Sequence, residues 1–338
     1  MADIDDDVLA KAAGWISDGK DVALATVIAT WGSSPRPVGS QLAVDGDGAF
    51  VGSVSGGCIE GAVIGEALNS ISDGKVRLLD FGVTNEQAWE VGLACGGDIK
   101  VFVKKAHDGD EMNRLARERP LATVTNIETG ARSFVTGDNV DGDLALNDEM
   151  LGEVRNAIRD DRSRIFDQDD ASLFVQVFNK PLRMLIVGAV HISQALVPMA
   201  QTAGFGVTVI DPRGSFATDA RFPAVTLIDE WPDDAMEELK PDVRTAVVTL
   251  THDPKLDDPA LQVALKSDAF YIGSLGSKRT HASRLERLTE MGFGEDAFLR
   301  INGPIGLDLG ASSPAEIAVS ILGEIIAAKH GKLETFAS

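Results

Sequence analysis

Cysteine is scarce in this chain of 338 residues, with Cys58 and Cys95 only. Two cysteines 37 positions apart cannot form the disulfide framework of a small secreted domain. The N-terminus is acidic and lacks the basic and apolar segments of a signal peptide. No stretch approaches the roughly 20 apolar residues that span a bilayer. We therefore expect a cytoplasmic protein without membrane contact.

Basic and aromatic residues are also few. Lysine and arginine number 31 against 52 acidic residues, which gives a net charge of −21, and only 6% of the residues are aromatic. A duplex-binding surface needs a basic patch, and a single-strand-binding surface needs aromatic stacking platforms. The composition thus excludes a nucleic-acid partner, and we interpret the charge as a device for solubility.

The length suits two domains. From Pro181 onward, apolar strands such as "LRMLIVGAV", "GVTVIDP" and "TAVVTL" alternate with helical segments, which predicts a doubly wound parallel sheet. We expect an α/β protein with an N-terminal mixed α/β domain over residues 1–178 and a C-terminal Rossmann-like domain over residues 179–338. The charged stretch 159–170 is either the connection between the domains or a solvated helix face.

Local signals place several elements of both domains. Residues 6–18 and 86–93 read as helices, and "DGDG" at 45–48 reads as the turn of a hairpin, because Asp-Gly tolerates positive φ angles. The last helix is marked by Ser313 as N-cap, Pro314 in the first turn and Glu316 completing a capping box.

Both cysteines adjoin a glycine pair. Cys58 follows Gly56 and Gly57 in "SGGCIE", and Cys95 precedes Gly96 and Gly97 in "LACGGD". A helix is expected after Cys58, so its amide N–H groups would favour the thiolate, and the glycines leave room for a bulky ligand. Soft thiolates bind transition metals. The two cysteines are therefore either metal-binding thiols or small buried residues beside structural turns.

The loop "WGSSPRPVGS" carries Arg36 between two prolines and shortly after Ser33 and Ser34. The prolines reduce the freedom of the loop, so a guanidinium can be presented to a ligand at low entropic cost. The alternative is a plain turn.

The turn "VGAVHIS" occupies the position of a dinucleotide-binding fingerprint. Gly188 follows the strand, and Asp211 ends the next strand, where a ribose-binding acid stands in nucleotide-binding domains. The second and third glycines of that fingerprint are replaced by Val190 and Ser193. The branched valine intrudes on the pyrophosphate position, so the pattern predicts the fold more strongly than it predicts nucleotide binding.

A second glycine-containing turn follows a later strand. In "YIGSLGSKRTHASR", Gly273 and Gly276 permit close backbone approach, Ser277 can cap a helix, and Lys278 and Arg279 lie in its first turn. Cations at a helix N-terminus oppose the helix dipole unless an anion is bound, which indicates a phosphate site. A capped helix with solvated basic residues is the alternative.

His252 lies just after the strand "TAVVTL", at the sheet edge where such folds bind ligands. A turn with Asp253 as helix cap would explain this segment equally well. The histidines show no metal-ligand spacing, which argues against structural zinc.

Several of these segments resemble one family. "GSSPRPVGSQLAV", "GSVSGGCIE" and "CGGDIKVFV" are similar to the first domain of the XdhC/CoxI family. "VTVIDPRGSFATDARFP", "YIGSLGSKRTHASRLERL" and "GPIGLDLGASSPAEIAVSILGEII" resemble its C-terminal Rossmann-like domain. The resemblance leaves residues 108–180 unsupported, and Val190 departs from the "GAGH" that members commonly carry.

The resemblance implies a non-enzymatic accessory chaperone. Such proteins bind the molybdenum cofactor, a molybdopterin in its mononucleotide or cytosine dinucleotide form. They present it to a cysteine desulfurase for sulfuration and pass it to the apo-enzyme of xanthine dehydrogenase or a related molybdenum hydroxylase. The resemblance also makes a homodimer plausible.

The role of each segment in that binding is our own assignment. We expect Cys58 and Cys95 near the metal, the Arg36 loop on the pterin, and residues 273–279 on the phosphate. Two other functions stay open: an NAD(P)-dependent oxidoreductase that uses the Rossmann-like domain with His252, and a scaffold without a small ligand.

Overall fold

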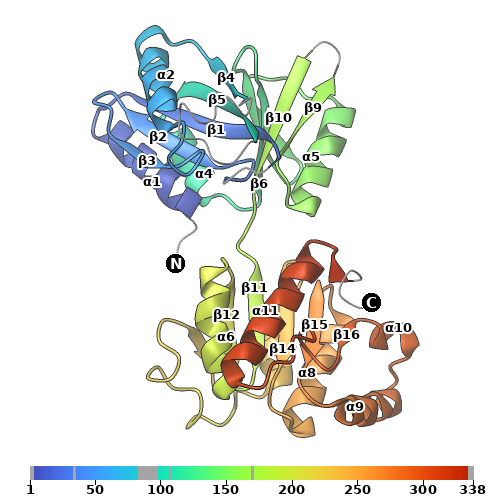
Figure 1. Cartoon of the computed structure of the whole chain (residues 1–338). Coiled ribbons are helices and arrows are strands. Elements are labelled where there is room, and N and C mark those ends of the chain that lie inside the picture. The colour runs from blue at the N-terminus through green and yellow to red at the C-terminus, as the bar shows by residue number, and fades with distance from the viewer. Residues whose placement is uncertain (1–3, 33–35, 83–96, 107, 169–170, 334–338) are drawn as a thin grey trace. The chain divides into compact units, whose positions relative to one another are not determined.

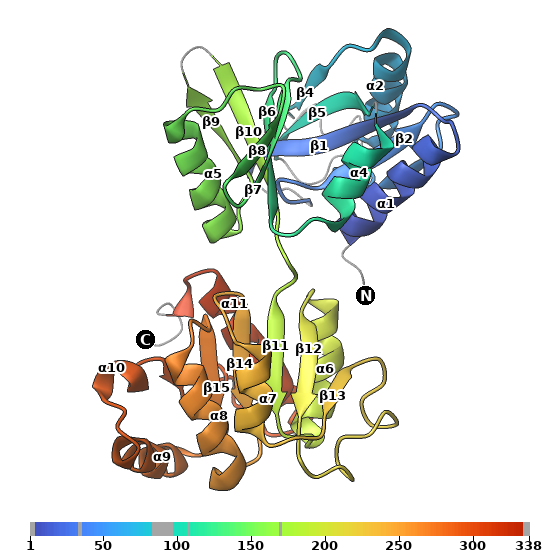
Figure 2. The same ribbon diagram turned by 180° about the vertical axis from the view of Figure 1, so that it is seen from behind.

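The computed structural model describes residues 4–32, 36–82, 97–106, 108–168 and 171–333. The chain divides into two compact units, Ala2–Lys180 and Pro181–Ser338. Figures 1 and 2 show the elements of both units from two sides. Among the helices of the described ranges, none combines the length and the apolar character that crossing a membrane requires.

The first unit contains an antiparallel sheet in the order β3-β2-β1-β5-β4. Its strands are β1 (Val22–Trp31), β2 (Gln41–Asp45), β3 (Phe50–Gly52), β4 (Arg77–Phe81) and β5 (Asp98–Ala106). Helix α2 (Glu60–Asp73) packs on one face, and α1 (Ile4–Ser17) and α4 (Gly109–Arg117) pack on the other. Because both faces are covered, residues 22–28 of β1 are all buried, and their sequence is a nearly continuous apolar run.

A second antiparallel sheet completes this unit, in the order β8-β7-β6-β10-β9. Its strands are β6 (Leu121–Asn126), β7 (Arg132–Thr136), β8 (Asn139–Gly142), β9 (Arg164–Gln168) and β10 (Ala171–Phe178). Helix α5 (Asp148–Asp160) covers it through Val154 and Ala157. Phe102 of β5 and Phe174 of β10 share one buried cluster, which joins the two sheets.

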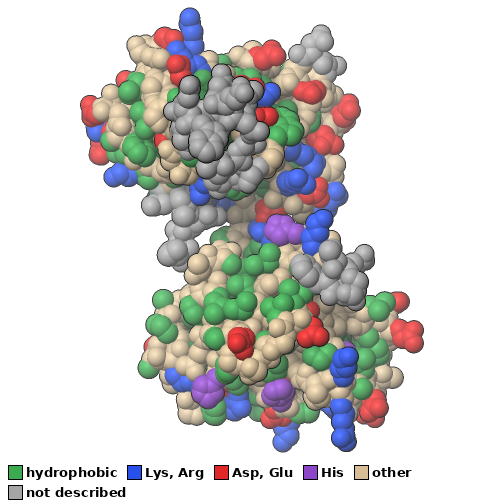
Figure 3. Space-filling view, viewed as in Figure 1, with side chains coloured by type: hydrophobic (Ala, Val, Ile, Leu, Met, Phe, Trp, Pro, Cys, Tyr) green, Lys and Arg blue, Asp and Glu red, His purple; other side chains and the backbone are tan. Residues whose placement is uncertain are grey.

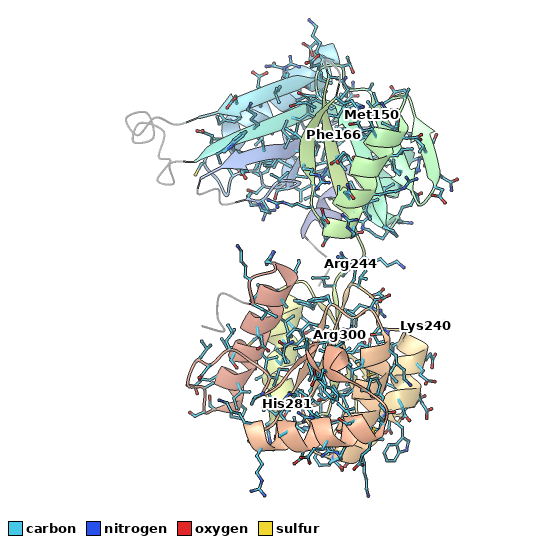
Figure 4. All side chains as sticks on the ribbon, turned by 90° about the vertical axis from the view of Figure 1, so that its right-hand side faces the viewer. Met150, Phe166, Lys240, Arg244, His281 and Arg300 are labelled. Atoms are coloured by element: carbon cyan, nitrogen blue, oxygen red, sulfur yellow. The ribbon has the colours of Figure 1, made fainter. Side chains whose placement is uncertain are left out.

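The charged stretch 159–170 is not the connection between the units, and that interpretation was wrong. The stretch begins at the end of α5 and contains β9, which pairs with β10 inside the first unit. Phe166 of β9 and Met150 of α5 both pack on the apolar cluster of this sheet (Figure 4). The charges were misleading because β9 is an edge strand and none of its side chains is fully buried.

The second unit is a parallel sheet in the order β13-β12-β11-β14-β15-β16. Its strands are β11 (Arg183–Val187), β12 (Gly206–Ile210), β13 (Thr226–Ile228), β14 (Thr245–Thr249), β15 (Tyr271–Ser274) and β16 (Ile301–Asn302). Counted from β11, this is the order 3-2-1-4-5-6 of a Rossmann fold. The predicted fold class, a mixed α/β unit followed by a Rossmann-like unit, is confirmed.

Helices cover both faces of the parallel sheet (Figures 1 and 2). On one face lie α6 (His191–Thr202) and α11 (Pro314–Lys329), and on the other lie α7 (Pro232–Leu239), α8 (Pro254–Lys266) and α9 (Lys278–Glu290). The short helix α10 (Glu295–Phe298) precedes β16. The predicted capping box of α11 is present: the Ser313 hydroxyl accepts a hydrogen bond from the Glu316 N–H at 3.3 Å, and the Glu316 carboxylate accepts one from the Ser313 N–H at 2.9 Å.

Candidate functional site

The loops that hold the predicted residues of the first unit leave its first sheet at one end. At that end, β1 finishes opposite the start of β5, where Trp31 pairs with Asp98. Strand β4 finishes there too, with Phe81 opposite Ile99. Residues 82 and 97 therefore lie at the same end of the sheet as the start of the loop that carries Arg36. Ser33, Ser34, Cys95, Gly96 and the helix predicted at 86–93 lie outside the described residues.

The segment Ser53–Ile59, here called the Cys58 loop, is wrapped around the carboxylate of Glu60. One carboxylate oxygen accepts hydrogen bonds from the Ser53 hydroxyl at 2.7 Å, the Val54 N–H at 3.2 Å and the Ser55 N–H at 2.9 Å. The other accepts from the Ser55 hydroxyl at 2.6 Å and the Gly57 N–H at 2.9 Å. Glu60 is only 8% exposed, so these five donors replace the water that a free carboxylate would bind.

The ionisation of Glu60 follows from these contacts. Burial alone would raise the pKa of Glu60, but the hydroxyls of Ser55 and Ser53 and the backbone N–H of Ser55 outweigh it and lower the pKa to about 2. Glu60 is therefore a buried anion at neutral pH. The sequence analysis did not select this residue, because a glutamate after "GGCI" is also typical of the first turn of any helix.

Ser55 organises the entry into α2. Its hydroxyl oxygen accepts hydrogen bonds from the N–H groups of Cys58 and Ile59, both at 3.0 Å. Ile59 is the N-cap residue and offers no side-chain cap. The backbone N–H groups that lead into the helix are thus satisfied by Ser55 and Glu60, which fixes the backbone on both sides of Cys58.

Cys58 is exposed at the surface of this fixed loop. Gly56 and Gly57 precede it at φ angles of 77° and 112°, in the region that favours glycine. A Cβ atom built at Gly57 would meet nothing within 4 Å among the described residues. Cys58 is therefore exposed beside two glycines, and it is not a small buried residue.

Arg36 lies beside the Cys58 loop. Its Nε donates a hydrogen bond to the Ser53 carbonyl oxygen at 3.2 Å, and the residue is half-buried. The structure thus brings together two of the predicted groups, Arg36 and Gly56–Cys58. It also places Gly97 at the sheet end from which the Arg36 loop departs. Across the described ranges, no three His, Cys, Asp or Glu side chains are grouped closely enough to hold a metal ion.

In the second unit, the turn after β11 is closed by its own residues. Gly188 has a φ of 112°, and a Cβ atom there would lie 2.6 Å from Cγ2 of Thr251, in the segment that follows β14. The Ser193 hydroxyl donates to the Gly188 carbonyl oxygen at 2.6 Å and accepts from the Val190 N–H at 2.8 Å. Serine at the third glycine position therefore ties the turn to α6.

The carboxylate of Asp211 is already occupied. It is fully buried and accepts hydrogen bonds from the Ala189 N–H at 2.8 Å and from two nitrogens of the Arg213 guanidinium at 2.8 and 2.7 Å. Burial opposes ionisation, but the hydrogen bonds from Arg213 and the backbone lower the pKa of Asp211. A ribose hydroxyl would have to compete with Arg213, a residue that the sequence analysis did not select.

The next group of predicted residues of this unit lies between the end of β15 and the first turn of α9. Ser277 caps α9 by accepting from the Thr280 N–H at 3.1 Å, and the predicted phosphate contacts Lys278 and Arg279 are exposed in the first turn of that helix. Gly276 has a φ of 147°. Packing explains the glycine at position 273, since a Cβ atom there would lie 2.5 Å from Cδ1 of Ile305.

His252 is exposed, with a φ of 63°. The next residue, Asp253, caps α8 by accepting from the Lys255 N–H at 3.0 Å. The capped-turn interpretation of "THDPK" therefore describes the geometry, and a ligand contact by His252 stays a prediction.

Comparison with known proteins assigns both units to one family. Residues 184–325 match the XdhC Rossmann domain, and residues 15–82 match the XdhC and CoxI family. The chain belongs to the XdhC/CoxI family. The two matches together cover more than half of the chain. The match in the N-terminal unit ends just beyond β4, before the segment that contains Cys95.

Two curated relatives match almost the whole chain. The molybdenum cofactor insertion chaperone PaoD of Escherichia coli is 28% identical over 329 residues, which cover 94% of this chain and 86% of the relative. A Bacillus subtilis protein, named as one of the probable subunits of xanthine dehydrogenase, is 28% identical over 321 residues, which cover 92% of this chain and 94% of the relative.

A solved structure shares the fold. The crystal structure of a Bacillus halodurans protein, described as a xanthine dehydrogenase, superposes with a TM-score of 0.77 at 24% sequence identity. The match covers 97% of this chain and 96% of the other.

Proposed function

We propose that this protein is a maturation chaperone that binds the molybdenum cofactor and delivers it to a molybdenum hydroxylase of the xanthine dehydrogenase type. Two lines support the proposal. One relative in the XdhC/CoxI family is named as a molybdenum cofactor insertion chaperone, and another is named as a probable component of xanthine dehydrogenase. The first unit also presents a thiol in the way that a soft metal centre requires.

The single observation that carries the proposal is the Cys58 loop. An exposed thiol follows Gly57, where a Cβ atom would meet nothing within 4 Å among the described residues, and Glu60 and Ser55 hold the backbone of this loop. A thiolate is a soft ligand suited to a transition-metal centre, and a rigid mount keeps the ordering cost of binding low. The glycines admit a bulky guest that larger side chains would block.

The role that we propose for each binding residue is the one assigned in the sequence analysis. Cys95 is the second thiol near the metal, and Arg36 with Ser33 and Ser34 contacts the pterin. The N-terminus of α9, with Lys278 and Arg279, receives a phosphate or the nucleotide tail. The loaded chaperone presents the cofactor to a cysteine desulfurase for sulfuration and then to the apo-hydroxylase.

An NAD(P)-dependent oxidoreductase is the second candidate, because the strand order of the second unit is that of dinucleotide-binding domains. Against it stand Val190 at the N-cap of α6 and the pairing of Asp211 with Arg213. Saturable NADH binding at micromolar concentration, without pterin in the purified protein, would favour this candidate over the chaperone.

The experiment that tests the proposal is transfer of the cofactor. Protein purified from a host that makes molybdopterin is mixed with a cofactor-free molybdenum hydroxylase, and recovery of hydroxylase activity is followed. The wild type should activate the apo-enzyme, Cys58→Ala should activate it at least tenfold less, and Glu66→Gln, an exposed change on α2, should match the wild type. Equal activation by the Cys58 variant would refute the role of this thiol, and no activation by any form would refute delivery.

A further inference from the structure

The hydroxyl of Ser40 is buried without a hydrogen-bond partner. The residue is 2% exposed, and the described residues offer its Oγ neither a donor nor an acceptor. The charged side chains that Figure 3 shows at the surface are solvated by water, whereas this hydroxyl is enclosed. Nearly all buried polar groups in folded proteins are paired, because an unpaired one is destabilising. The Ser40 hydroxyl therefore points to a partner that the described residues do not supply.

A β-bulge fixes the backbone of Ser40. The Gly39 N–H donates to the Val27 carbonyl oxygen at 2.8 Å, and the Val27 N–H donates to the Ser40 carbonyl oxygen at 2.9 Å. Two residues thus oppose one, and Gly39 has a φ of 96°, which is the pattern of a G1 bulge. The Ser40 N–H donates to the Pro37 carbonyl oxygen at 3.2 Å. Both backbone groups of Ser40 are therefore satisfied, and its hydroxyl alone is left over.

The side chain of Ser40 lies on the side of the sheet that the Cys58 loop covers. Side chains alternate along a strand, so Ser40 shares a face with Leu42. Leu42 packs in one buried cluster with Val54 of the Cys58 loop. Gln41, the residue between them, points to the other face, where its Nε2 lies 3.5 Å from Oε1 of Gln176 in the second sheet. The unpartnered hydroxyl and the Cys58 loop are thus on the same face.

Short bonds tie the segment around Ser40 to the Cys58 loop. Ser53, the first residue of that loop, accepts a hydrogen bond from Nε of Arg36 at its carbonyl oxygen, at 3.2 Å. The Ser53 N–H donates to the Gln41 carbonyl oxygen at 3.0 Å. Ser40 therefore belongs to the segment 36–41 that borders the Cys58 loop, between the residues that the proposed function assigns to the metal and to the pterin.

Three other buried side-chain atoms of the described residues lack a partner: Oε1 of Gln41, Oγ1 of Thr136 and Nε of Arg284. Gln41 points to the opposite face of the sheet, Thr136 ends β7 in the second sheet, and Arg284 belongs to α9 in the second unit. Of the four residues, Ser40 is the one on the face of the Cys58 loop.

We propose that the Ser40 hydroxyl forms a hydrogen bond with the polar edge of the pterin in the bound molybdenum cofactor, an inference that rests on the proposed function. A pterin ring carries N–H donors, a carbonyl oxygen and ring nitrogens along one edge. A hydroxyl can donate and accept at this edge, whereas the guanidinium of Arg36 can only donate. Because the bulge already holds Ser40 in place, little conformational freedom is lost on binding.

The test separates binding from folding, because the fold does not depend on an unpartnered hydroxyl. Full-length protein is purified from a host that makes molybdopterin, and the pterin that stays bound after dilution is followed by the fluorescence of its oxidised derivative. Ser40→Ala should lose the pterin about tenfold faster than the wild type, and its melting temperature should be unchanged or higher. Thr136→Val removes the other unpartnered hydroxyl and is the matched control. It should keep the melting temperature and release the pterin at the wild-type rate.

Two results would overturn the assignment of Ser40. The first is a loaded wild type whose pterin leaves Ser40→Ala at the same rate. The second is a clearly lower melting temperature of Ser40→Ala, which would show that the hydroxyl serves the fold through an ordered water. A wild type that carries no pterin would refute the proposed function itself, and the role of Ser40 would be refuted with it.

Discussion

Replacing Glu60 by glutamine tests whether its buried carboxylate organises the Cys58 loop. Both carboxylate oxygens accept a backbone N–H, from Val54 and Ser55 on one side and from Gly57 on the other. A glutamine amide has one oxygen only, so in either orientation its NH₂ group faces a backbone donor. At least one backbone N–H of the loop must then lose its partner.

The magnitude follows from the ionisation of Glu60. Its pKa falls from 4.5 to about 2 in the folded protein, which corresponds to about 3 kcal/mol of stabilisation at neutral pH, at about 1.4 kcal/mol per tenfold change in acidity. Because the folded-state pKa is the lower one, this stabilisation is present above pH 4.5 and is lost as the pH falls towards 2. The stability difference between wild type and Glu60→Gln should therefore shrink from about 3 kcal/mol at pH 7 to about 1.5 kcal/mol at pH 3.

Hydrogen–deuterium exchange of the peptide that covers residues 53–59 is the assay. In Glu60→Gln the amides of Val54, Ser55 and Gly57 should exchange at least tenfold faster than in the wild type. Glu66→Gln is the matched control, because Glu66 is 41% exposed and its ion pair with Arg77 contributes less than about 1 kcal/mol. If the amides of residues 53–59 exchanged at the same rate in Glu60→Gln, in Glu66→Gln and in the wild type, the role given to the Glu60 carboxylate would be refuted.

Two further predictions concern the second unit. Gly188→Ala should destabilise it by about 3 kcal/mol, because alanine is strained at a φ of 112° and its Cβ would lie 2.6 Å from Cγ2 of Thr251. Gly204→Ala, at a φ of 86° with open space around it, should lower the free energy of unfolding by only about 1 kcal/mol. Thermal unfolding of both variants measures the difference. Equal costs would show that contact with Thr251 does not determine the turn. Ser313→Ala should lower stability by about 1 kcal/mol through loss of the α11 cap, whereas Ser313→Asp should preserve it.

The second unit was predictable from sequence because local signals and global fold agree there. Apolar strands alternate with amphipathic helices, and four consecutive residues, Ser313–Glu316, are sufficient to predict the N-terminal cap of α11. The same holds for the hairpin of β2 and β3, whose Asp-Gly turn sets its own geometry. In these segments each residue's preference is satisfied within a few positions along the chain.

The second sheet of the first unit could not be predicted from such local signals. Strand β8 is exposed at every position and β9 is charged, because each lies at an edge of the sheet, so neither shows the alternation of a half-buried strand. Their membership in the sheet comes from pairing with β7 and β10, which sequence periodicity does not record.

The functional residues that escaped prediction share a physical reason. Glu60 and Arg213 are charged side chains whose partners lie only a few residues earlier in the chain, and these contacts form only when the backbone turns back on itself. The sequence marked the bare backbone around Cys58 but not the anion that holds it. A buried acid three residues after a glycine pair is the signal that could have found it.

The most direct measurement of the central claim is the molybdenum and pterin content of the protein purified from a host that makes the cofactor. Wild type and Glu66→Gln should each carry close to one molybdenum and one pterin per chain, and Cys58→Ser should carry less than a tenth of that. Wild-type protein without either component, or a Cys58 variant as fully loaded as the wild type, would contradict the account of an exposed thiol that receives the metal.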